Sequence, residues 1–429
     1  VYGSGAIGGT INITTKKGKP GFHKDIEYMT GTNGTHNLAA SISGADDANN
    51  FFIGLERYQT DGVSALRHNT EKDRYRNNSI VANYDRILSD EFEFQARSRV
   101  AESYLQYDAV SGTSGFAHNE EQDSLEGSAN VSLVYKPMEN FTNKFTVANT
   151  TIRRVYADAP GSNNTIKDNY AGDRDAYMYS GNYNFNLDNS IVFGYEREED
   201  AVGYNANATG NIDKHSWVNS KYYDYQSRLT ENLYVTLGSR FDEHQRAGTE
   251  DSHRVTAAYL LDDNLTKLKA SYGTGFRYPS IYEEFFVYAA NSASLPNVKA
   301  ENSKSYDFGI EKTFLNKGLK IDLSYFDMEY SDTLEGWTQS NSSGLAFTTA
   351  NMPGLVKSKG IEFISQWQKS DFLNFGLNYT YTKTYDGAEQ DDPNRNSSYF
   401  DERMVRVPDN VVNLITNIKF PNNKNLDLT

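Results

Sequence analysis

The sequence predicts an all-β fold, a transmembrane antiparallel β-barrel. Three observations favour this class: apolar and polar residues alternate along many short segments, short polar turns alternate with long loops, and aromatic residues are abundant in a chain that is polar on average. The 429 residues include 31 Tyr and 23 Phe, and the mean hydropathy is −0.69. A transmembrane strand needs only about 9 to 11 residues with every second side chain facing lipid, so a polar average is expected.

The alternation has the two-residue period of a β-strand, in which successive side chains point to opposite faces. Between 373 and 381 every odd position is Leu, Phe or Tyr, and every even position is Asn, Gly or Thr. The segments 177–187, 233–241, 306–311 and 319–325 repeat this pattern, and their apolar faces carry no charged residue. We therefore expect strands with one apolar face and no sustained helix.

The connections between the predicted strands differ in length. Short polar turns are expected near 46–47, 89–90, 137–140, 188–189, 231–232, 262–264, 316–318, 370–371 and 422–423. Each interval between them has room for two strands and one long loop, which is the arrangement of outer-membrane barrels. With a further hairpin around 31–34, the count is roughly 18 strands.

Composition excludes several classes of function. The 42 basic and 57 acidic residues give a net charge of −15, which argues against a nucleic-acid partner because phosphate binding needs a concentrated basic face. The absence of Cys removes thiolate metal sites and Cys nucleophiles. No His pair has metal-site spacing, and no nucleophile elbow or phosphate-binding loop occurs, so the chain is not predicted to be an enzyme.

The first residues form a glycine-rich motif, VYGSGAIGGTINITTK, which ends in an alternating stretch. Its glycines permit tight turns and close approach of the backbone to a neighbour. The motif resembles the end of the plug domain in TonB-dependent outer-membrane receptors. The positions that carry the resemblance are Tyr2, Gly3, Gly5, Ile7, Gly8 and Gly9.

Later segments resemble the same family, so the likeness covers nearly the whole chain. They are ASYGTGFRYPSIYE at 270–283, LPNVKAENSKSY at 295–306, the stretch 351–363 and the tripeptide RVP at 406–408. The resemblance implies a barrel of the 22-stranded plugged type. Residues 1–21 would be the C-terminal end of the plug domain, and residues 22–429 would be the barrel, incomplete at its C-terminus.

The resemblance also implies a function. In this family a plug fills a barrel that is integral to the bacterial outer membrane, in contact with its lipid. An inner-membrane TonB complex pulls on an N-terminal segment of the receptor, which here would precede Val1. The expected function is TonB-dependent active import of a large, scarce nutrient.

Within the family, the early loops look most like those of the cobalamin receptors, through residues 52–62 and 107–109. Cobalamin is therefore the favoured ligand, and a ferric siderophore is the alternative, because aromatic side chains suit either one. The predicted substrate-binding residues are Tyr58, Asp61, Tyr104, Asp108, Tyr278 and Tyr282. Each could instead be a loop-packing aromatic or a solvated charge.

Calcium is a possible cofactor, because acid-rich loops hold it at these two places in the cobalamin receptors. Here Asp73 and Asp108 are the candidate ligands. Calcium takes six to eight oxygen ligands, and basic residues surround Asp73 in sequence, so solvated loop charges are the competing interpretation.

Two readings of another class stay open. A passive porin would need neither plug nor TonB, and the glycine-rich motif argues against it. An outer-membrane enzyme or adhesin would show hydrolysis or cell binding that survives loss of TonB.

Overall fold

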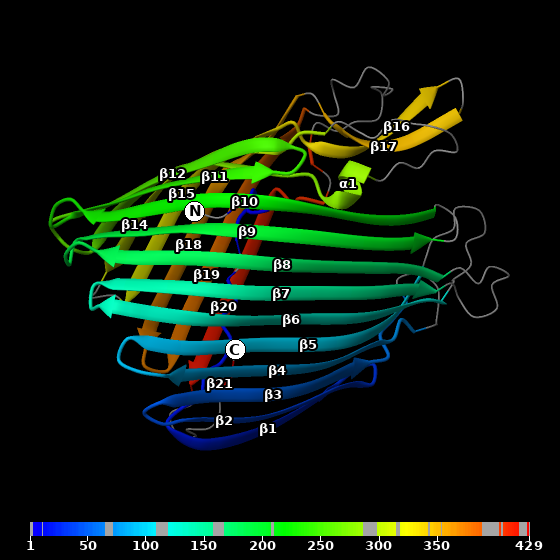
Figure 1. Ribbon diagram of the computed structural model, residues 1–429. Coiled ribbons are helices and arrows are strands. Elements are labelled where there is room, and N and C mark those ends of the chain that lie inside the picture. The colour runs from blue at the N-terminus through cyan, green and yellow to red at the C-terminus, as the bar shows by residue number, and fades with distance from the viewer. Residues whose placement is uncertain are drawn as a thin grey trace. The chain divides into compact units, whose positions relative to one another are not determined.

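The chain folds almost entirely into antiparallel β-strands (Figure 1). The computed structural model describes residues 3–10, 12–64, 72–108, 119–157, 167–206, 210–285, 298–314, 318–341, 344–352, 354–387, 403–404, 406–419 and 427–428. Two compact units share the chain. Unit 1 comprises Val1–Thr10, Tyr183–Phe193 and Ser220–Thr429, and unit 2 comprises Ile11–Asn182 and Gly194–Asn219.

The strands of unit 2 pair antiparallel in chain order. They are β1 (Gly21–Gly31), β2 (Thr35–Ala45), β3 (Asn49–Thr60), β4 (Tyr75–Ile87), β5 (Phe92–Asp108), β6 (Asn119–Met138) and β7 (Phe141–Ala157). Three further strands have residues in both units: β8 (Lys167–Asn184), β9 (Asn189–Ala206) and β10 (Gly210–Arg228).

Unit 1 continues the same up-and-down pattern. Its strands are β11 (Leu233–His244), β12 (Gly248–Leu260), β13 (Thr266–Arg277), β14 (Glu301–Phe314), β15 (Leu319–Ser331), β18 (Leu355–Ser370), β19 (Leu373–Asp386), β20 (Asn410–Lys419) and the short β21 (Asp427–Leu428). In the described part of the chain, nineteen strands belong to one sheet. A helix, α1 (Ile281–Phe285), and a separate hairpin, β16 (Leu334–Asn341) with β17 (Gly344–Asn351), lie in the connections.

In unit 2 the two faces of the sheet differ as the alternation predicts. One face exposes apolar side chains, among them Leu55 and Ile80, each 51% exposed. The opposite face is covered by residues 16–18 at the N-terminal side of β1. There the Asn83 amide donates a 2.9 Å hydrogen bond to the Lys16 carbonyl, and Lys17 lies 3.1 Å from the Asp85 carboxylate. We call the apolar face the outer face and the covered face the inner face.

In unit 1 the predicted apolar positions also share one face. Phe308 is 58% exposed, and Tyr325, its partner on β15, is 39% exposed on the same face. The inner face of the same strands carries charges that pair with one another: Lys269 lies 2.6 Å from Asp322 on β15. This confirms that the apolar and polar sets occupy opposite faces.

The turns lie where the sequence predicts them within the described residues. The β1–β2 connection, residues 32–34, turns at Asn33 and Gly34, with φ of 55° and 64°, the left-handed pair of a type I′ turn that the Thr35 N–H closes on the Thr32 carbonyl at 3.1 Å. Helix α1 and the β16–β17 hairpin were not expected, because elements this short leave little periodicity to detect. Among the described residues, no helix has the length and apolar character to span a bilayer.

Candidate functional site

The glycine-rich segment, residues 3–10, lies against the inner face of β11 and β13 in unit 1. Tyr2 lies outside the described residues. A Cβ at Gly3 would lie 2.5–2.7 Å from the Arg240 guanidinium, so only glycine fits there. Arg240 is fixed in turn, because its Nε lies 3.0 Å from Asp242 and its terminal nitrogen donates a 2.7 Å hydrogen bond to Ser220. Both members of this ion pair are buried.

Tyr278 joins the glycine-rich segment to the end of β13. Its backbone N–H donates a 2.9 Å hydrogen bond to the Ser4 hydroxyl. Its phenol donates to the carbonyls of Asp242 and Gly248, at 3.1 and 3.2 Å, and its ring lies 4.7 Å from the His244 ring. Burial raises the pKa of Tyr278, so the phenol stays a donor. The residue predicted to touch substrate is thus largely enclosed by its own unit.

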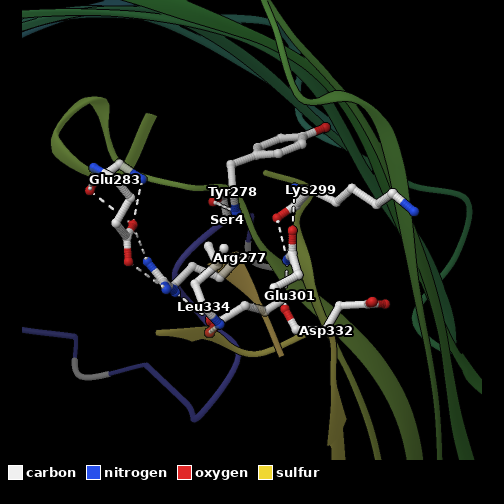
Figure 2. Close-up of polar contacts among 10 residues, drawn as sticks. Ser4, Arg277, Tyr278, Glu283, Lys299, Glu301, Asp332 and Leu334 are labelled. Atoms are coloured by element: carbon white, nitrogen blue, oxygen red, sulfur yellow. Dashed lines mark hydrogen bonds and ion pairs between the residues drawn. The ribbon is translucent and has the colours of Figure 1, made fainter. Parts of the chain in front are cut away.

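Arg277 holds three connections together at the end of β13 (Figure 2). Its guanidinium donates two hydrogen bonds to Glu283 of α1, at 2.9 and 3.0 Å, and one to Glu301 at the start of β14. Glu301 also accepts a 2.6 Å bond from the Leu334 N–H at the start of β16. Burial raises the pKa of Glu283, but hydrogen bonds from Arg277 and Ser280 outweigh it and the net pKa is lowered.

Asn351 closes the same region from the end of β17. Its side chain accepts a 2.7 Å hydrogen bond from the Lys299 N–H and donates to the carbonyls of Lys299 and Asp332, at 3.0 and 2.8 Å (Figure 2). Residues 278–285, residues 298–300 and the β16–β17 hairpin therefore form one hydrogen-bonded assembly, and Tyr278 joins it to Ser4 of the glycine-rich segment.

Glu284 is a buried carboxyl in α1 with an exposed fraction of 2%. One carboxylate oxygen, Oε1, lies 3.7 Å from Arg246, and the other has no hydrogen-bond partner among the described residues. His244 lies 3.8 Å away, but its Nδ1 already accepts backbone hydrogen bonds from Arg246 and Ala247, so this nitrogen carries no proton. Burial raises the pKa of Glu284 to about 7, against the opposing charge of Arg246.

Tyr282, the other predicted residue of unit 1, lies on α1 and is 47% exposed. The structure thus presents Tyr282 to solvent and encloses Tyr278. The glycine-rich segment was the part of this site that the sequence identified. Arg240, Arg277 and Glu284 were missed, since each contacts a residue distant in sequence: Gly3, Glu301 and Arg246, respectively.

Four predicted residues lie at the ends of β3 and β5 in unit 2. Tyr58 is on the inner face of β3, and its ring lies 6.0 Å from that of Tyr75. Asp61 follows β3 and lies 2.8 Å from Lys72 and 3.9 Å from Arg74. The hydrogen bond from Lys72 lowers the pKa of Asp61. Asp61 is therefore held as a carboxylate by local cations.

Tyr104 and Asp108 are four residues apart on β5. The register places Tyr104 on the same face as Val100, which is the outer face, opposite Tyr58. Its phenol donates a 2.8 Å hydrogen bond to Glu121, and Arg76 lies over its ring at 5.8 Å. Asp108, at the end of the strand, accepts a 3.1 Å hydrogen bond from Ser64. The structure does not bring Tyr104 and Tyr58 onto one face.

The two candidate calcium ligands belong to neighbouring connections. A Cβ at Gly62 would lie 2.1 Å from the Asp73 carbonyl, so the residues after β3 pass close to Asp73, and Ser64 contacts Asp108. Within the described ranges, no group of three or more His, Asp and Glu side chains could hold a metal. The two carboxylates alone fall short of the six to eight oxygens that calcium takes.

The chain is similar to known proteins in sequence and in fold. The family described as "TonB dependent receptor-like, beta-barrel" matches residues 25–427. The chain is 24% identical over 347 residues to the vitamin B12 transporter BtuB of Photobacterium profundum, covering 80% of this chain and 54% of that protein. It is 23% identical to the iron-regulated outer membrane virulence protein of Vibrio cholerae, covering 78% and 52%. The chain therefore spans about half the length of the curated relatives it matches.

Among solved structures, the ferric enterobactin receptor mutant Q482A of Pseudomonas aeruginosa, in complex with enterobactin, superposes with a TM-score of 0.82. That match has 15% identity and covers 97% of this chain and 69% of the other. The likeness is one of fold.

Proposed function

Because the chain belongs to the TonB-dependent receptors, which are β-barrel receptors of the bacterial outer membrane, we propose that it imports a large, scarce nutrient across that membrane. Energy would come from a TonB complex. The observation that carries this proposal is the seating of the glycine-rich segment against the inner face of unit 1, at Arg240 and Tyr278. Such contacts suit the end of a plug, and a passive porin has no use for them.

The proposed ligand is cobalamin, with a ferric siderophore second. The relative in Photobacterium profundum is a vitamin B12 transporter, and this supports cobalamin. The relative in Vibrio cholerae is an iron-regulated protein, and this supports the alternative. Both identities are low, so binding has to decide between them.

The test is equilibrium binding to the receptor in detergent. Cyanocobalamin, with and without calcium, is compared with a small panel of ferric siderophores. Tight cobalamin binding supports the first proposal, and a calcium requirement would restore a role for Asp73 and Asp108. Siderophore binding without a cobalamin signal replaces the ligand and keeps the importer. A large conductance that is unchanged when residues 1–21 are deleted would replace import by a porin.

We propose that the predicted residues contact the ligand, and we expect their contributions to binding to differ. Tyr58 lies on the inner face of β3 and Tyr282 on α1 is 47% exposed, and this supports a contact with ligand at each. Tyr104 lies on the opposite, outer face. It would contact a ligand only if a loop brought that ligand to the outer side. Alanine at Tyr58 should weaken binding at least as much as alanine at Tyr104, and unchanged affinity in both variants would remove them from the site.

A further inference from the structure

A polar cavity of about 390 Å³ lies between the glycine-rich segment and strands β12–β15. The wall contributed by the strands is rich in hydroxyls and glycine, with Ser252, Ser271, Gly273, Ser303 and Ser305 among its residues. The opposite wall is the backbone of residues 3 and 6–10. This cavity is distinct from the contacts of Arg277 and Glu284.

Arg254 of β12 lines the cavity, and its guanidinium has no hydrogen bond or ion pair to any residue that the structure describes. The register explains why. Gly238 on β11 and Gly273 on β13 stand directly beside Arg254, so neither neighbouring strand offers a side chain there. The guanidinium is exposed on the inner face and keeps its five N–H donors available.

The other cations on the inner face of β11–β15 differ from Arg254, because each lies beside a carboxylate within the described residues. Lys267 lies 3.3 Å from Glu311, Lys320 lies 3.1 Å from the same side chain, and Arg240 is paired with Asp242. Lys269 and Arg277 have their partners on β15 and on α1 and β14. The Arg254 guanidinium, unpaired among cations that are paired, is suited to bind an anion that is not part of the described residues.

Ser252 supplies a second, independent observation. It stands on the same face of β12 as Arg254 and lines the same cavity, and it is only 3% exposed. Its hydroxyl has no hydrogen-bond partner among the described residues. A buried hydroxyl without a partner destabilises the protein, and this cost is removed when a polar group binds beside it.

We propose that this cavity is an oxyanion subsite, in which Arg254 and the Ser252 hydroxyl receive a carboxylate or phosphate group. The group is either carried by the imported nutrient or belongs to a free inorganic anion. The first source rests on the proposed import function, and the second does not. The cavity is too small for a whole large nutrient, so it receives one anionic group. It does so while the glycine-rich segment, which forms one of its walls, remains against the strands.

Asp307 also lines the cavity and brings a carboxylate to its wall. It belongs to β14, and the pairing of Gly273 with Ser305 puts it beyond the row of Arg254. Its Oδ2 accepts a 2.7 Å hydrogen bond from Ser271. The cavity therefore has a basic side at Arg254 and an acidic side at Asp307, and an oxyanion is expected at the former.

The experiment titrates inorganic phosphate, and separately succinate, into the detergent-solubilised protein and follows binding by calorimetry. Arg254→Gln removes the guanidinium, and Ser252→Ala removes the hydroxyl. Lys304→Gln is the matched control, since it removes one positive charge from an exposed position on β14. Circular dichroism verifies that every variant keeps its β-sheet.

Phosphate affinity should fall at least tenfold in Arg254→Gln and a few-fold in Ser252→Ala, and it should be unchanged in Lys304→Gln. Equal affinity in the wild-type protein and Arg254→Gln would overturn the subsite. Uptake by cells then identifies the source of the anion. A raised KM for the nutrient in Arg254→Gln assigns the anion to the nutrient, and unchanged uptake assigns it to a free ion. If the wild-type protein imports nothing, the import proposal fails while the phosphate titration still decides the subsite.

Discussion

At the scale of single residues, the lack of a side chain at Gly3 lets the glycine-rich segment lie against β11. Gly3 touches Arg240, which cannot retreat because Asp242 and Ser220 hold it. Gly8, five residues later, has nothing within 4 Å of its would-be Cβ. Two glycines of the same motif therefore have different roles.

Gly3→Ala should unseat the segment, because its methyl group would overlap the Arg240 guanidinium. We expect a loss of stability of about 1–3 kcal/mol, the usual cost of an added methyl in a tight site. Urea unfolding measures it, and Gly8→Ala is the control that should behave as wild type. Equal effects of both substitutions would contradict the assigned contact.

Glu284 makes the packing of α1 sensitive to pH. Its folded pKa of about 7 exceeds the ordinary value of 4.5, so the folded state binds the proton more tightly. The stability that this provides is complete below about pH 4.5 and is lost as the pH rises through about 7. Glu284→Gln should abolish the loss, so that hydrogen exchange in α1, corrected for its intrinsic rate, no longer accelerates between pH 6 and 8. The same pH dependence in the variant would exclude Glu284 as its cause.

At the scale of elements, alternation determines which face of a strand meets which surroundings. Leu377 and Asn378 are neighbours on β19, with Leu377 38% exposed on the outer face and Asn378 on the inner face. The sequence predicted this assignment correctly, because period-two alternation needs no knowledge of partners. The same alternation could have predicted that Tyr104 shares a face with Val100, four residues before it, and this face is opposite the face of Tyr58.

Leu377→Arg should destabilise the protein in lipid vesicles by roughly 2–4 kcal/mol if the position lies near the bilayer midplane. Asn378→Arg, one residue away on the polar face, should cost much less. Unfolding by urea in vesicles compares the two. A larger loss in Asn378→Arg would reverse the assignment of the faces.

Arg277 determines how the connections after β13 are held. Arg277→Gln leaves the carboxylates of Glu283 and Glu301, which are 21% and 12% exposed, without their guanidinium. The expected cost is about 1–3 kcal/mol, seen as faster hydrogen exchange of the Leu334 amide. Arg153→Gln breaks an exposed pair with Asp173 and should cost less than about 1 kcal/mol. Unaltered exchange at Leu334 would remove Arg277 from this role.

At the scale of the whole molecule, the sequence predicted the fold class, the turns and the glycine-rich motif. These depend on local patterns that survive in any 10-residue window. The contacts of the site could not be predicted, because Ser4 meets Tyr278 and Gly3 meets Arg240 across most of the chain. The assembly around Arg277 depends on a five-residue helix and an eight-residue hairpin strand, both too short to show a period.

We propose that the glycine-rich segment must leave the strands for import to occur, because it lies against the inner face of β11 and β13. A Cβ at Gly275 would lie 3.8 Å from the Ile7 Cα and 2.9 Å from the Ser303 hydroxyl, which would have to rotate away. The chain contains no Cys, so a pair of cysteines at 7 and 275 would have no competing thiol. The most direct measurement is nutrient uptake by cells that carry the Ile7→Cys/Gly275→Cys receptor, before and after reduction. The account predicts that the oxidised receptor binds ligand without importing it, and that reduction restores uptake that depends on TonB. Uptake at the wild-type rate through the oxidised receptor would contradict the account.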